Sequence, residues 1–106
     1  MTVISLADYQ QYSRDKMKKN NLFQTERLFC DVYCFEPGQE QKGHIHGTQD
    51  KVYLVMEGAG TFHVGAEKRV LEAGQATMAS AGEEHGVKNH TDRRLKVLVF
   101  VAPNPA

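Results

Sequence analysis

Three histidines have the residue type and the spacing to hold a metal ion. His44 and His46 lie two residues apart. Because side chains of a strand alternate between its two faces, both imidazole rings would point the same way, with their Cα atoms about 7 Å apart. Neutral imidazole is the commonest transition-metal ligand in proteins. His85, early in a later strand, is the best candidate for a third ligand, whereas His63 and His90 have no partner at ligand spacing.

These histidines lie in a stretch of short strands and turns. From Leu28 onward, runs rich in Val, Phe, Tyr and Leu alternate with Gly, Pro, Asn or Asp, which is typical of strands separated by turns. Eight short strands with no helix between them predict an all-β fold, an antiparallel sandwich or barrel. The expected strands cover residues 26–36, 44–47, 51–57, 61–64, 68–71, 76–79, 84–89 and 95–101.

The N-terminal segment has a helical pattern instead. Ser5 followed by Asp8 resembles a capping box, and apolar residues recur at the spacing of one helical face. We therefore expect a short helix within residues 1–20, followed by a β-barrel over residues 26–101. Both would belong to one domain that covers residues 1–106, because a chain of this length supports one core.

Composition excludes several classes of protein. Hydrophobic residues make up 41% and charged residues 25% of the chain, so neither disorder nor a fibrous repeat is expected. Thirteen Lys plus Arg balance thirteen Asp plus Glu, which leaves no net charge to attract nucleic acid or an anionic membrane. The longest apolar runs, 52–56 and 97–102, are far shorter than the roughly 20 residues of a membrane helix. With no apolar signal core at the N-terminus, a cytoplasmic location is expected.

The two cysteines are expected to be free thiols. Cys30 and Cys34 lie four residues apart in one expected strand, which separates their Cα atoms by about 13 Å. A disulfide bridges at most about 7 Å. Two cysteines are also too few for a structural zinc cage. We expect both thiols to be buried or half-buried.

The segment with His44 and His46 resembles the first sequence motif of the cupin family. That motif is a glycine, five residues, His-x-His, three or four residues, a glutamate, six residues and a second glycine. Here Gly38, the two histidines and Gly58 keep these intervals, and Lys51 takes the place of the glutamate.

The segment with His85 resembles the second cupin motif. That motif is a glycine, five residues, Pro-x-Gly, two residues, a histidine, three residues and an asparagine. Gly74, Gly82, His85 and Asn89 keep every interval, and Ser80 replaces the proline. The two motifs lie within one continuous half of the chain.

The resemblance implies a fold, a cofactor and an assembly. It implies a double-stranded β-helix, or jelly-roll, cupin barrel. Metal-binding cupins usually hold Mn, Fe, Ni, Cu or Zn through three histidines and the glutamate, so the resemblance implies a divalent transition metal on His44, His46 and His85. Family members commonly pair through strands at one sheet edge, and a homodimer is therefore expected.

Lys51 in the place of the glutamate leaves four alternatives open. A charged ammonium about 5 Å from a divalent ion would be repelled by several kcal/mol at an effective dielectric constant near 20. Asp50 is a possible metal ligand if a bulge turns it inward. Alternatively, the histidines form an open face while Lys51 loses its proton or contacts an anionic substrate oxygen. In the third alternative Lys51 pairs with Asp50 or reaches solvent. In the fourth, no metal binds and the pocket holds a small ligand by hydrogen bonds.

Lys51 and Tyr53 are the candidate catalytic residues, because they share one strand face with Val55 and would line the barrel interior. We expect a metalloenzyme, dioxygenase-like or related, in which the metal polarises an oxygen of a small-molecule substrate. An isomerase with a histidine base is a further enzyme alternative. The non-catalytic alternative is a small-molecule or sugar-binding or sensor cupin, with or without metal, and the missing glutamate is its main support.

Overall fold

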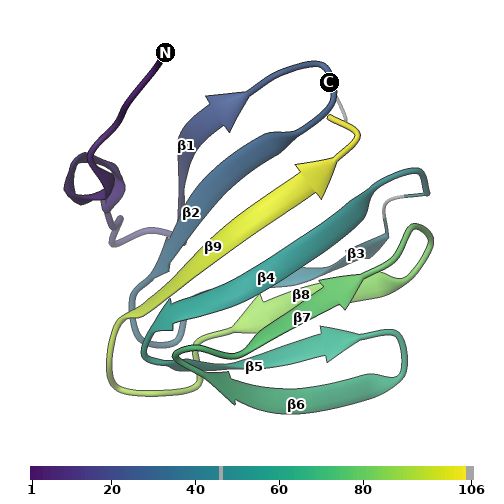
Figure 1. The fold of residues 1–106 in the computed structure, drawn as a ribbon. Helices are drawn as coiled ribbons and strands as arrows, with labels where there is room; N and C mark the ends of the chain where they lie inside the picture. Colours follow the sequence, from purple (N-terminus) through teal and green to yellow (C-terminus); the bar gives the residue numbers. More distant parts are fainter. Residues whose placement is uncertain (46, 105–106) are drawn as a thin grey trace.

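The computed structural model describes residues 1–45 and 47–104, which form two antiparallel sheets (Figure 1). The elements are η1 (Leu6–Tyr9), β1 (Lys18–Gln24), β2 (Phe29–Phe35), β3 (Glu40–Ile45), β4 (Asp50–Glu57), β5 (Ala59–Val64), β6 (Glu67–Glu72), β7 (Ala76–Ala79), β8 (Glu84–Lys88) and β9 (Leu95–Ala102). One sheet has the strand order β1-β2-β9-β4-β7, and the other has the order β3-β8-β5-β6. The prediction of an all-β fold is confirmed.

All eight expected strands are present, and β3 differs most from its predicted bounds. It begins at Glu40 rather than at residue 44. Glu40 pairs with Lys88 of β8, and Gln41 pairs with Val87. The pairing of the two strands therefore begins before the segment whose pattern predicted a strand. A β-bulge then interrupts the pairing between Gln41 and His44.

The prediction of an N-terminal helix is wrong except for one short turn. η1 is a 3₁₀ helix of four residues with no buried side chain, and Ser5 makes no capping hydrogen bond. Without an apolar face to bury, so short a helix cannot grow. Residues 18–24 form β1 instead, because pairing with β2 satisfies their backbone groups. Within the described residues, no helix is long and apolar enough to cross a membrane.

The core lies between the two sheets and is built from alternate residues of the central strands. Val97 and Val99 of β9 are fully buried, as is Tyr53 of β4, and Val55 is almost so. Successive side chains of a strand point to opposite faces. Lys51 shares the parity of Tyr53 and Val55, and it is 2% exposed. The expectation that these three residues line the interior is confirmed.

Both cysteines are free and buried, as predicted. They lie on β2 at the parity opposite to that of the core residue Tyr33, so they face away from the barrel interior. The Nδ2 group of Asn20 donates to the Sγ atom of Cys34 at 3.5 Å. Burial raises the pKa of both thiols, which lowers the fraction of reactive thiolate.

Gly58 closes the turn between β4 and β5, and we expect its replacement by alanine to be strongly destabilising. Its φ is +80°, and a Cβ atom there would lie 2.3 Å from the backbone oxygen of Arg94. Left-handed strain plus a clash with rigid backbone should lower the free energy of unfolding by about 3 kcal/mol, measured by urea denaturation.

Gly74→Ala is the matched control for this variant. Gly74 has a φ of +89°, but no atom lies within 4 Å of the added Cβ. It should lose only about 1 kcal/mol, from backbone strain alone. Equal losses in the two variants would contradict the clash at Gly58.

Candidate functional site

Two of the three predicted metal ligands lie against each other. His44 is directly opposite His85 in the antiparallel pair of β3 and β8. The two ring centroids are 4.3 Å apart, and the ring planes make an angle of 62°. His85 is 1% exposed, and His44 is half-buried. The fold therefore brings together histidines that lie 41 residues apart in the chain.

The backbone fixes which nitrogen of each ring carries the hydrogen. Nδ1 of His44 lies 2.9 Å from the carbonyl oxygen of Lys42, and Nδ1 of His85 lies 2.9 Å from that of Glu83. A carbonyl oxygen can only accept, so both Nδ1 atoms donate. In the neutral rings, Nε2 then carries the lone pair, as in histidines that bind metals through Nε2. The chemistry of this donor pair fits a transition metal.

Asp50, the predicted oxygen ligand, is not brought to this histidine pair. His46, the predicted partner of His44 in the first motif, lies outside the described residues. Asp50 is exposed, and its Oδ1 accepts a hydrogen bond from the backbone N–H of Ala81 at 2.9 Å. Among residues 1–45 and 47–104, no three His, Cys, Asp or Glu side chains form a group that could hold a metal ion.

Lys51 is buried among polar and aromatic side chains. Its Nζ atom donates to Oε1 of Gln41 at 3.1 Å, and it lies 5.0 Å from the ring centroid of Tyr33 and 5.1 Å from that of Tyr53. Burial, reinforced by the positive charge of Lys19, lowers the pKa of Lys51 to about 7. The alternative in which Lys51 reaches solvent or pairs with Asp50 is therefore wrong.

Tyr53 lies between this lysine and the histidine pair. Its ring makes edge contacts with the ring of His85, at a centroid distance of 6.3 Å, and with that of Phe62, at 5.4 Å. The hydroxyl group donates to Oε1 of Gln41 at 3.5 Å. Burial raises the pKa of Tyr53, which keeps the hydroxyl protonated. The structure thus places both candidate catalytic residues in one interior cluster.

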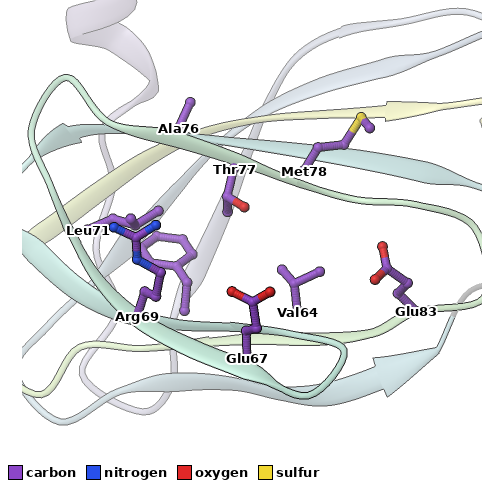
Figure 2. A pocket seen from close by; sticks show the side chains of 9 residues that line it. Val64, Glu67, Arg69, Leu71, Ala76, Thr77, Met78 and Glu83 are labelled. Carbon is purple, nitrogen blue, oxygen red and sulfur yellow. The ribbon is translucent and has the colours of Figure 1, made fainter.

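A pocket of about 300 Å³ opens between β5 and β6 on one side and β7 on the other. Figure 2 shows Glu67, Arg69 and Glu83 on one side of this pocket, with Thr77 and Met78 across from them. The pocket adjoins the histidines, because the lining residue Val64 is directly opposite His85 in the pairing of β5 with β8. Its lining combines apolar side chains with three charged ones, Glu67, Arg69 and Glu83.

Three polar residues of this region were not predicted from the sequence: Gln41, Asp31 and Arg69. Arg69 lies on β6, whose residues are mostly exposed, so no pattern marks it. Gln41 faces the cluster only because of the bulge, which shifts its parity relative to His44. Asp31 shares the parity of Tyr33 on β2, and a charged residue in an otherwise apolar strand is the one signal that could have found it.

The paired motif histidines lie within a segment that matches a known family. The family model for the Cupin domain matches residues 31–101. The chain belongs to the cupin family. As a cupin, it has the double-stranded β-helix fold that the resemblance implied, and the short η1 turn replaces the expected helix.

Solved structures and a curated protein support this assignment. The cupin is 41% identical to TT1209 from Thermus thermophilus, with a TM-score of 0.95 and coverage of 99% of this chain and 100% of that one. An uncharacterized Klebsiella pneumoniae protein with a double-stranded β-helix domain is 25% identical, with a TM-score of 0.90 and coverage of 100% and 93%. The oxalate-binding protein of Thermotoga maritima is 25% identical over 85 residues, which are 80% of this chain and 69% of that protein. The similarity to this last protein is distant.

Proposed function

We propose that this cupin holds a divalent transition metal on His44, His46 and His85 and binds a small molecule beside it. One observation carries the proposal: the rings of His44 and His85, from two separate motifs, lie in edge contact, and a backbone carbonyl holds each Nδ1. These bonds orient the rings and fix the tautomer whose Nε2 atom can bind a metal. The role of His46 rests on the spacing of the motif alone.

The ligand that we propose is a small carboxylate. Three neutral imidazoles leave the charge of a divalent ion uncompensated, and Lys51 adds no negative charge where the family has a glutamate. Such a site favours an anionic ligand. The name of the Thermotoga maritima relative, which is an oxalate-binding protein, agrees with this class.

The residues of the chain would bind and orient such a ligand. A metal on the histidines would supply Lewis acidity toward an oxygen atom of the ligand. Tyr53 keeps its hydroxyl proton and can donate it in a hydrogen bond, and the buried ring of Phe62 limits the access of water. A dioxygenase-like or other enzyme reaction is one outcome of this arrangement. Non-catalytic binding is the second candidate, favoured by the buried amine in place of a carboxylate ligand.

Metal content is the test of this proposal. We expect about one metal ion per chain when the purified protein is supplemented separately with Mn, Fe, Ni, Cu or Zn, dialysed and subjected to elemental analysis. Calorimetric titration with oxalate should then show tighter binding to the metal-loaded protein than to the protein stripped with a chelator. Failure of every metal to bind stoichiometrically would overturn the metal proposal.

Lys51→Glu should raise the affinity for the metal by at least about tenfold, because it restores a carboxylate where the family has one and removes a positive charge. Competition with a chromogenic chelator measures this affinity. Lys51→Met removes the charge without adding a ligand, so it should give a smaller gain. If neither variant changes the affinity, the side chain at position 51 does not act on the ion.

Three further expectations stay predictions. They are a single domain over residues 1–106, a homodimer and a cytoplasmic location. The similarity to an oxalate-binding protein supports a small-molecule partner, and it leaves the assembly open.

A further inference from the structure

Three charged side chains line the pocket between β6 and β7 without pairing with one another. Glu67 and Arg69 lie on β6, and Glu83 lies in the turn before β8. Within residues 1–45 and 47–104, none of the three takes part in an ion pair. A guanidinium group is always charged and donates two parallel hydrogen bonds to a carboxylate. Arg69 can therefore pair with an anionic group from outside the chain.

The parity of β6 turns two of these charges toward the pocket. Arg69 is directly opposite Phe62 of β5, which is buried, so both side chains lie on the inner face of this sheet. Glu67, two residues earlier, shares that face, with its Cα atom about 7 Å away. Lys68 lies between them and points to the outer face, opposite His63. A lysine adjacent in sequence thus stands outside the pocket.

The turn before β8 holds the carboxylate of Glu83 at the pocket. Its Oε1 atom accepts a hydrogen bond from the backbone N–H of Ser80 at 2.9 Å, and its own backbone N–H donates to the carbonyl of Ser80 at 3.0 Å. An ionised carboxylate accepts hydrogen bonds on both oxygens. Oε2 makes no hydrogen bond with any residue that the structure describes, so it can accept one from a ligand.

The charges are separated along the pocket. Figure 2 shows Arg69 and Glu83 toward opposite ends, with Glu67 between them. Apolar side chains, among them Leu71 and Met78, form the rest of the wall. The volume of about 300 Å³ lies at the lower end of the range for small-molecule sites. The pocket therefore suits a small ligand that has a positive group, a negative group and an apolar part.

Ligands with a single charge match this lining only in part. A carboxylate paired with Arg69 would be repelled by Glu67 and Glu83, and an amine paired with these two residues would be repelled by Arg69. A molecule that carries a carboxylate and an ammonium group on neighbouring atoms pairs with all three side chains. Amino acids have this arrangement, and an apolar side chain would cover the apolar wall.

We propose that this pocket binds an amino acid with an apolar side chain, with its carboxylate on Arg69 and its ammonium group between Glu67 and Glu83. Glu67 and Arg69 are exposed, and one exposed ion pair contributes little. A ligand that forms several such pairs and also buries an apolar side chain combines their contributions. The inference goes beyond the proposed function, because these residues need no metal to bind the amino acid.

Titration of chelator-stripped protein with leucine tests the site. Leucine is compared at pH 7 with isocaproate, which lacks the ammonium group, and with isoamylamine, which lacks the carboxylate. Chemical-shift changes in NMR spectra report the three affinities. Leucine should bind at least about fivefold more tightly than either analogue, because it alone pairs with both kinds of charge.

Two results of this titration would contradict the proposal. Equal or tighter binding of either analogue would overturn the amino-acid class. If none of the three molecules binds, there is no site, and the inward charges of β6 only protect an edge strand from pairing with another chain.

Variants locate the binding and separate the two charges. Arg69→Met should weaken leucine binding at least about threefold and remove the preference for leucine over isoamylamine. Glu83→Gln should weaken it by a similar factor and reduce the preference over isocaproate. The glutamine keeps an oxygen that accepts from Ser80, so the turn is preserved. Lys68→Met is the control on the outer face and should change neither quantity. Unchanged leucine binding in both Arg69→Met and Glu83→Gln would overturn the site.

Metal content gives a separate readout in the same proteins. Stoichiometric metal without binding of leucine would leave the metal site standing and refute the amino-acid pocket. Binding of leucine without stoichiometric metal would do the reverse.

Discussion

Replacing His85 with alanine should lower the affinity of the protein for its metal by more than about 100-fold, because a direct ligand is lost rather than a supporting group. The ring of His85 is buried, lies 4.3 Å from that of His44 and is oriented by the carbonyl of Glu83. Elemental analysis after dialysis and chelator competition measure the loss.

His90→Ala is the control for this variant. His90 is exposed, and its Nδ1 atom shares a hydrogen bond with the hydroxyl of Thr61 at 2.8 Å. Its removal should leave metal binding unchanged. Because His85→Ala also opens a cavity in the barrel, His44→Ala at a half-buried position provides a second, milder removal of a ligand. Full metal content in both His85→Ala and His44→Ala would refute the metal site.

Replacing Lys51 with methionine should stabilise the protein by several kcal/mol at pH 6. Burial and Lys19 lower the pKa of Lys51 from 10.5 to about 7 in the folded protein, and one pKa unit is worth about 1.4 kcal/mol. Below pH 7 the lysine is charged in both states, so the native state carries the whole cost of burying the ammonium. Methionine has a similar length and carries no charge.

The gain from Lys51→Met should shrink as the pH rises from about 7 toward 10. In this range the folded lysine has released its proton while the unfolded lysine keeps it, so the unfolded state binds more protons and raising the pH stabilises the native protein. Urea denaturation at several pH values measures the difference, and Lys68→Met is the exposed control. A gain that does not change with pH would contradict a buried, titrating Lys51.

Much of the fold follows from local patterns. Alternation of apolar and polar residues predicts a strand wherever one face is buried, and Lys51, Tyr53 and Val55 point inward as their parity requires. The pairing of His44 with His85 required more than alternation, because it joins separate segments. The spacing of two motifs predicted that both histidines belong to one site, and the antiparallel pairing of β3 with β8 places them together.

The wrong or missing predictions have physical causes that cannot be seen in one segment of the sequence alone. Met17 fits a helical spacing, yet it is buried in the barrel core next to the first strand, because tertiary packing overrides a weak local preference. Gln41 turns toward Lys51 only through a bulge, and a bulge cannot be derived from alternation. The low pKa of Lys51 depends on its burial and on the charge of Lys19 in another strand. Contacts between separate strands could not be predicted from the sequence.

The position of β1 at the edge of its sheet also bears on self-association. An edge strand offers unpaired backbone groups to any neighbouring strand, and lysines are a common defence against edge-to-edge aggregation. Residues 16–24 hold three lysines and no acidic residue. If the β1 strands of two copies paired antiparallel, their lysines would come close together along the new strand pair and repel one another. Continuous sheets across a homodimer should therefore form through strands other than β1.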